Sequence, residues 1–214
     1  MVRKTLNIPA RKRPKQSTTR ESIIARASEL FSDRGYLETS MEDIALAAGV
    51  SKGAIYHYFT GKTEILFSIC SDYVGFDVKN LEQGVNDIQP GLDQIRYIIS
   101  RHINHYASHA HAAKTLLNEA YNLPPRYFKK VKETERGYYR IVAGVLSCYL
   151  GPKVEKETVT ALAFTLFGMC NWIFSWYDPK RAVSPARLST IIFDVFTKGI
   201  RGMQESAGSG TRGR

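Results

Sequence analysis

Apolar side chains recur along most of the chain at intervals of three and four residues, the spacing that places them on one face of an α-helix. No stretch alternates apolar and polar residues between hairpin turns, and no internal repeat is present. The sequence therefore predicts an all-α fold. In the clearest segment, residues 92–109, the inward positions are Ile95, Ile98, Ile99, Ile103 and Tyr106.

Prolines and glycines divide the chain into separate helices. A capping box formed by Thr18 and Glu21 predicts the start of the first helix, and Gly35 predicts its end. Proline and glycine also mark breaks at residues 90–91, 122–125, 151–152 and 178–179. Beyond a long helix that begins near residue 62, the segments between these breaks predict helices over residues 92–109, 127–150, 155–177 and 185–203.

Residues 39–62 predict two short helices joined by a sharp turn. Ser40 followed by Asp43 is an acidic variant of the capping box, so a helix is expected to begin just after Ser40. Gly49 tolerates the left-handed backbone of a helix exit, and Ser51 can cap the second helix. This spacing is typical of a helix-turn-helix.

The second helix of this pair is expected to face outward with hydrogen-bond donors and no acid. Ala45 is small enough to let it approach the first helix closely. Basic, hydroxyl and imidazole groups suit phosphates and base edges. An ordinary helical hairpin is the alternative. Residues 49–53 also match the G-x-S-x-G nucleophile elbow, but that motif follows a β-strand and here a helix is predicted. The outward positions are Lys52, Gly53, Ala54, Tyr56 and His57, with Lys62 just beyond them.

Residues 23–66 resemble the TetR family of bacterial transcriptional repressors, through the core AxxLFxxxGYxxTSMxDIAxAAGVSKGAIYHYFxxKxEIL. Members of that family are all-α homodimers that bind palindromic operators in double-stranded DNA and release them when a small molecule enters the C-terminal domain. The resemblance implies that Thr39 and Ser40 contact the DNA backbone and that Lys62 contacts a phosphate. It implies base-edge contacts by Lys52, Gly53 and Ala54. It also implies contacts with phosphates and nearby bases by Tyr56, His57 and Tyr58.

Charge is concentrated at the two ends of the chain. The 214 residues carry a formal net charge of +10, of which residues 1–20 supply +7 and residues 201–214 supply +2. A basic arm beside a helix-turn-helix suggests contact with the DNA backbone or minor groove, although a solvated tail has the same composition. The expected organisation is a basic flexible arm (1–17), a three-helix helix-turn-helix DNA-binding domain (18–61), a helical effector-binding and dimerisation domain (62–205) and a flexible tail (206–214).

The cysteines and the N-terminus indicate a cytoplasmic protein. Cys70, Cys148 and Cys170 are far apart without CxxC spacing, so they are expected to be buried thiols in a reducing compartment. No apolar run follows the basic N-terminus, so no secretory signal is predicted. Residues 158–177 lack charge and are long enough to span a membrane, but five polar residues interrupt them. A helix buried at an oligomer interface is the preferred interpretation.

Four histidines, His102, His105, His109 and His111, lie close together in sequence. Helical spacing brings three of them to one face, where a metal site is geometrically possible. No nearby Cys, Asp or Glu completes a ligand shell, so no metal or other cofactor is predicted. The alternatives are polar lining of an effector pocket and ordinary surface or core histidines.

The last two predicted helices carry more aromatic residues than one protomer is expected to cover. They are therefore expected to pair with a second copy of the chain as a four-helix interface. Gly168 allows a partner helix to approach closely. The expected interface positions are Thr165, Gly168, Phe193 and Phe196.

The aromatic residues of the C-terminal part also suggest an apolar effector cavity. The alternative is that they simply fill the core and the dimer seam. NWIFSWYDP and ERGYY loosely resemble TetR-type regulators that respond to coenzyme A thioesters, and basic residues after the Pro124-Pro125 break would suit their phosphates: Arg126, Lys129, Lys130, Arg136 and Arg140. The expected cavity residues are Tyr106, His109, Asn118, Tyr121, Tyr138, Phe164, Phe167, Asn171, Trp172 and Trp176.

Three classes of function remain after these observations. A ligand-responsive repressor accounts for both halves of the chain. A constitutive DNA-binding or nucleoid-type protein accounts for the basic ends but not for the aromatic-rich C-terminal part. An enzyme needs a nucleophile with a base, or a metal set, and neither is evident beyond the histidine cluster. The sequence therefore predicts a non-enzymatic DNA-binding regulator.

Overall fold

The computed structural model describes residues 19–178 and 183–209, and all regular secondary structure in these ranges is helical. The predicted all-α class is confirmed. Thr18 and the expected basic arm lie outside the described residues. The helices are α1 (Thr19–Arg34), α2 (Met41–Ala48), α3 (Lys52–Tyr58), α4 (Lys62–Asn86), α5 (Leu92–Ser108), α6 (Ala110–Glu119), α7 (Pro125–Leu150), α8 (Lys156–Asn171) and α9 (Pro185–Ser209), with 3-10 turns η1 (Ala120–Asn122) and η2 (Trp172–Ser175).

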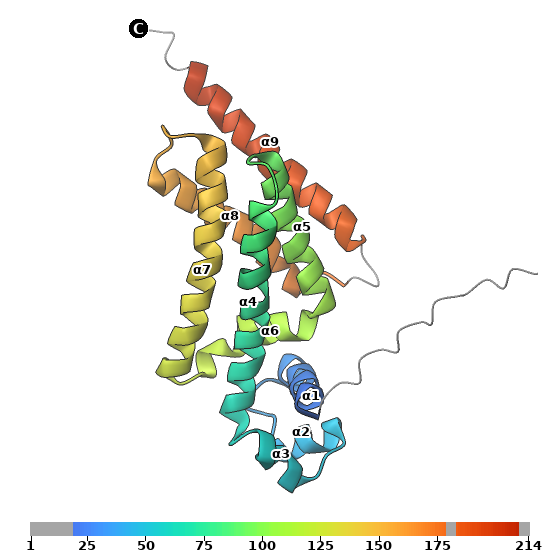
Figure 1. Ribbon diagram of the computed structural model, residues 1–214. Coiled ribbons are helices and arrows are strands. Elements are labelled where there is room, and N and C mark those ends of the chain that lie inside the picture. Colours follow the sequence, from blue (N-terminus) through green and yellow to red (C-terminus); the bar gives the residue numbers. More distant parts are fainter. Residues whose placement is uncertain (1–18, 179–182, 210–214) are drawn as a thin grey trace, which may run out of the picture.

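Helices α1 to α3 form a small bundle at one end of the molecule (Figure 1). The first turns of α4 close this bundle from the side, because Ile65, Leu66 and Ile69 are buried against it. Burial of these apolar side chains holds the three short helices together, since helices of seven or eight residues are marginal alone. The buried side chains contributed by α1 to α3 are Ile23, Ala27, Phe31, Ile44, Ala45 and Ile55.

Helix α4 connects the bundle to the rest of the protein. Its 25 residues run from the bundle to the far end of the molecule, alongside α5, α6 and α7 (Figure 1). The side chain of Thr60 and the backbone before the helix bond the Glu64 carboxylate, at 2.8 and 2.7 Å. These bonds fix the start of α4.

The sequence pattern assigned no helix between residues 109 and 122, and the structure places α6 there. The backbone turns at His109 (φ −137°, ψ 40°), and α6 then packs against α1. Thr115 is fully buried in this contact and its hydroxyl donates to the carbonyl of Ser28 at 3.3 Å. Ala120 and Leu123 join the same apolar cluster as α1 to α3. The packing of the N-terminal bundle therefore continues well beyond residue 62.

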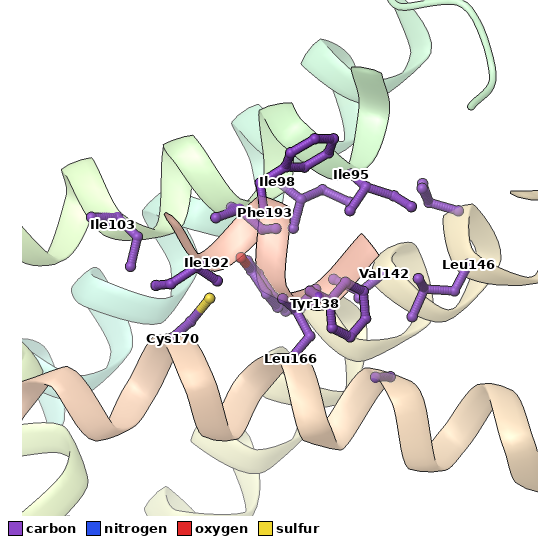
Figure 2. Packing of buried hydrophobic residues seen from close by; sticks show 14 of the residues in the cluster. Ile95, Ile98, Ile103, Tyr138, Val142, Leu146, Leu166, Cys170, Ile192 and Phe193 are labelled. Carbon is purple, nitrogen blue, oxygen red and sulfur yellow. The ribbon is translucent and has the colours of Figure 1, made fainter. Parts of the chain in front are cut away.

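A second apolar core lies among α5, α7, α8 and α9 (Figure 2). Ile95 and Ile98 of α5 face Phe193 of α9, and Val142 of α7 lies near Leu166 of α8. The five inward positions expected for residues 92–109 are all buried. The periodicity of the sequence thus correctly identified the inner face of α5.

The crossing of α2 and α3 depends on the small side chain of Ala45, which is only 4% exposed. We expect Ala45→Leu to lower the free energy of unfolding by about 1–3 kcal/mol, because the added atoms overpack this crossing. Thermal and denaturant unfolding measure the change. The matched control is Ala47→Leu, which enlarges an exposed alanine of the same helix. Equal stability of the two variants would contradict the importance of this contact.

Candidate nucleic-acid interface

Local hydrogen bonds build the turn between α2 and α3 as the sequence predicts. The Ser40 hydroxyl accepts from the Asp43 amide at 3.1 Å, and the Asp43 carboxylate accepts from the Ser40 amide at 2.8 Å. Gly49 ends α2 in the left-handed conformation (φ 66°, ψ 31°). The Ser51 hydroxyl then caps α3 by accepting from the Ala54 amide at 3.1 Å. The predicted helix-turn-helix is confirmed in each of these details.

Helix α3 presents its polar side chains to solvent. Ile55 is fully buried and anchors the helix, whereas Tyr56 is 47% and Tyr58 39% exposed. Lys52, Gly53 and His57 are also exposed, and Ala54 is half-buried. The structure therefore brings the expected contact residues of α3 together on one surface, where donors on a rigid helix can meet base edges and phosphates.

Two expected contact residues hold the framework instead of projecting freely. Thr39 is 2% exposed, and its hydroxyl donates to the carbonyl of Gly35 at 2.8 Å. Lys62 donates to the carbonyls of Tyr36 and Leu37 at 2.6 and 3.2 Å. Its ammonium lies 4.3 Å from the centre of the Tyr36 ring, and partial burial lowers its pKa. Ser40 is exposed but engaged with Asp43.

An acidic residue that the sequence analysis did not single out also lies on this surface. Glu42, in the first turn of α2, accepts a hydrogen bond from the ammonium of Lys52. The bond and the charge of Lys52 lower the pKa of Glu42, and the same contact raises the pKa of Lys52. Glu42 and Lys52 are ten positions apart in sequence and lie on different helices. The spacing of residues within one helix therefore does not reveal the pair.

The four clustered histidines do not form a metal site. His102 is half-buried at the C-terminal core, where its ring nitrogens lie 3.0 Å from the Tyr138 hydroxyl and 2.9 Å from Asn171 Oδ1. Burial lowers its pKa to about 4. His111 points to α1, 3.2 Å from the hydroxyl of Ser32. Within the described ranges, no group of three or more His, Cys, Asp or Glu side chains is arranged to hold a metal ion.

His105 is a core residue that contacts aromatic rings. It stacks on Phe76 with ring centres 5.1 Å apart and lies 4.4 Å from the ring of Tyr73. Burial, followed by the neighbouring His109, lowers its pKa to about 4. At neutral pH both His102 and His105 are therefore uncharged packing residues.

The residues expected to line an effector cavity lie only partly together. The Phe167 ring is 5.6 Å from that of Tyr138 and 6.0 Å from that of Phe164, between ring centres. Tyr106 and Tyr138 are buried, and Phe167 and Asn171 are half-buried, in the core that α8 forms with α5 and α7. The other expected residues are exposed, with Tyr121 73% accessible: His109, Asn118, Tyr121, Phe164, Trp172 and Trp176.

Two hollows in the described part of the chain lie elsewhere. One of about 620 Å³ opens between α4, α5 and α7, beside Val78, Glu82, Gln94 and Arg140. Another of about 380 Å³ lies between α4 and α5, and His109 is its only lining residue among those expected. None of the expected tyrosine, phenylalanine or tryptophan residues lines either of these two hollows, so the cavity residues stay a prediction.

The two phenylalanines of α9 that were expected at the dimer interface are buried inside the protomer. Phe193 and Phe196 are 5% and 4% exposed inside the protomer, and the Arg96 guanidinium lies 3.8 Å from the centre of the Phe193 ring. Among the described side chains of α9, the large apolar ones that are exposed are Ile191 and Val195. On α8 an apolar and small-residue face also remains exposed, formed by Phe164, Thr165 and Gly168 with Trp172 of η2.

The burial of the three cysteines tests the prediction that all of them are buried thiols. Cys70 and Cys170 are buried and their thiol pKa values rise to about 12, but Cys148 is exposed, so that part of the cysteine prediction is wrong.

Within the described ranges, one helical stretch, Lys156–Ser175, is long and apolar enough to cross a membrane. One third of an 18-residue window within it is buried in the protein, and the stretch packs on α7 and α9.

Comparisons with known proteins agree with this architecture. Residues 23–69 match the profile of bacterial regulatory proteins of the tetR family, and residues 89–200 match a tetracyclin repressor-like C-terminal domain. The fatty acid metabolism regulator protein of Bacillus subtilis (strain 168) is 28% identical over 192 residues, covering 88% of this chain and 97% of that protein.

Solved structures show the same fold. A TetR-family transcriptional regulator from Bordetella parapertussis 12822 superposes with a TM-score of 0.78 at 26% identity, covering 85% of this chain and 95% of that one. AibR, in complex with isovaleryl coenzyme A and operator DNA, superposes with a TM-score of 0.72 at 21% identity, covering 83% and 97%. The matched N-terminal and C-terminal profiles together span most of the sequence, and the chain therefore belongs to the TetR family of DNA-binding transcriptional regulators.

Proposed function

We propose that this chain is a ligand-responsive repressor that binds a palindromic operator as a homodimer and leaves it when a hydrophobic effector binds. The observation that carries the proposal is the exposed face of α3, held on a capped and buried framework. One such helix per chain reads one half-site, so two copies related by a twofold axis fit a palindrome.

The exposed face of α8 and α9 supports pairing of two copies. Val195 is 59%, Phe164 61% and Trp172 65% exposed, and large apolar side chains left exposed on a helix face are typical of a contact surface. Gly168 adds a place where a partner helix can approach. Burial of this face in a dimer would remove the apolar surface from water.

A buried hydroxyl in the C-terminal core supports the binding of an effector with a hydrogen-bond acceptor. Tyr106 is 2% exposed, and its hydroxyl has no hydrogen-bond partner within the described part of the chain. Burial raises its pKa, so it remains a neutral donor. A buried donor without a partner is unfavourable, and a ligand carbonyl would satisfy it. The apolar core to which Tyr106 belongs is rich in isoleucine, valine and leucine side chains, which suit an acyl chain.

An acyl thioester of coenzyme A is the effector class that these features favour. The 620 Å³ hollow is bordered by Arg140, and Arg136 is exposed one turn earlier on α7, so two cations are available to nucleotide phosphates. The relative named for fatty acid metabolism, and the isovaleryl coenzyme A in the AibR structure, support the same class of ligand. Because α4 borders this hollow and also carries Lys62, a shift of α4 would change the spacing of the two α3 helices.

Tyr56→Ala should weaken binding to operator and to scrambled duplex by similar factors, because a backbone-contacting residue carries no sequence information. Fluorescence anisotropy against the two duplexes measures the effect. Ala54→Ser is expected instead to change the base preference. Position 54 lies nearer than Tyr56 to the turn between α2 and α3. If Tyr56→Ala altered only the preferred sequence, the assigned division between α3 residues would be wrong.

Val195→Asp should convert the dimer into monomers at micromolar concentration, because the charge would be buried between the two copies. Sedimentation velocity measures the distribution. Leu46→Asp is the control, since Leu46 is 84% exposed on α2, away from α8 and α9. A dimer that survives Val195→Asp, or a wild-type monomer that binds half-sites at full affinity, would contradict this interface.

Tyr106→Phe should raise the free energy of unfolding of the ligand-free protein, because an unsatisfied buried hydroxyl costs about 1–3 kcal/mol. It should also raise the effector concentration needed for release by about 2- to 10-fold, the loss expected for one hydrogen bond. Long-chain and aromatic coenzyme A esters, the free acids and free coenzyme A are titrated against the operator complex. Tyr121→Phe, at a 73% exposed position, is the control. Release by none of these compounds would favour constitutive DNA binding.

A further inference from the structure

Glu42 places a negative charge on the surface that carries the DNA-contacting residues of α3. Its side chain is 58% exposed, and that of its partner Lys52 is 66% exposed. The two belong to different helices, and their ion pair crosses the turn between α2 and α3. Two exposed side chains in this arrangement contribute little to folding stability.

A carboxylate in this place works against binding to phosphate. DNA carries a dense negative charge, and affinity for any duplex sequence grows with the number of phosphates that cations neutralise. Glu42 cancels the charge of Lys52, which lies in the first turn of α3. The pair therefore lowers the attraction of this surface for DNA in general.

The pair leaves Lys52 able to recognise a base. An ammonium has three donors, and Glu42 accepts one of them, so two remain. The acceptors O6 and N7 of guanine lie in the major groove and suit a lysine donor. Held by Glu42, the ammonium is fixed at the N-terminal end of α3 and does not swing freely to the nearest phosphate.

We propose that Glu42 is a positioning residue that sets sequence specificity: it holds the Lys52 ammonium for a base-edge contact and suppresses its contact with phosphates of non-operator DNA. This inference rests on the proposed role of α3 in reading the operator. The inference gives helix α2 a role in distinguishing operator from non-operator DNA, in addition to the capping and packing roles of its other residues.

The test compares Glu42→Gln, Lys52→Met and the double variant on two duplexes of equal length, an operator selected from a randomised library and a scrambled sequence. Binding is measured over a range of salt concentrations. Glu42→Gln should bind the scrambled duplex more tightly, with a salt slope steeper by about 0.9, the value for one additional neutralised phosphate. The ratio of operator to scrambled affinity should fall about five- to tenfold, as for the loss of one base contact.

Lys52→Met should weaken operator binding and leave the salt slope on the scrambled duplex unchanged, because the paired Lys52 neutralises no phosphate there. In the Lys52→Met background, Glu42→Gln should have no further effect on the specificity ratio. Circular dichroism and melting temperature, unchanged in the single variants, show that the fold is retained.

Two results would overturn the inference. One is an unchanged salt slope and specificity ratio in Glu42→Gln. The other is an equal effect of Glu42→Gln with and without Lys52, which would make Glu42 a general repulsive charge. Failure to select any operator would instead contradict the proposed function, and the slope on the scrambled duplex would still decide the role of Glu42.

Discussion

The contact on which the arrangement most depends is the attachment of the start of α4 to the turn between α1 and α2. Lys62 bonds the carbonyls of Tyr36 and Leu37 and lies over the Tyr36 ring. The Tyr36 hydroxyl in turn lies 3.0 Å from the hydroxyl of Thr63. Partial burial of an ammonium is unfavourable unless such groups replace its water, so these bonds favour one position of α4 over its alternatives. The position of α3 relative to the C-terminal part follows from that attachment.

The sequence predicted the features that depend on neighbouring residues. The capping box of Ser40 and Asp43, the left-handed Gly49 and the inner face of α5 each follow from chemistry within a few positions. It did not predict the Glu42 to Lys52 pair or the inward rotation of Thr39. Both arise from how separate segments pack, and the spacing of residues within one helix carries no information about that.

Helix α9 shows why apolar periodicity alone cannot assign an interface. Phe193 and Phe196 lie on one side of the helix, and Ile191 and Val195 on another. Both sets have helical spacing, so the sequence cannot say which set faces the protomer. Packing against α5 determines which set faces the protomer, because Phe193 packs near Ile95 and Ile98 and the Arg96 guanidinium stacks on its ring. The smaller aliphatic side chains Ile191 and Val195 are therefore left facing solvent.

Buried and half-buried polar groups in the C-terminal core bear on the chemistry of the proposed effector. Asn171 Oδ1 accepts only, so the Nε2–H of His102 donates to it, and Nδ1 accepts from the Tyr138 hydroxyl. With its pKa lowered to about 4, His102 stays neutral and keeps this tautomer at neutral pH. These three groups satisfy one another, whereas the Tyr106 hydroxyl, one helical turn from His102, is left to donate. For the proposed effector, an acceptor next to an apolar body would therefore be favoured in this core.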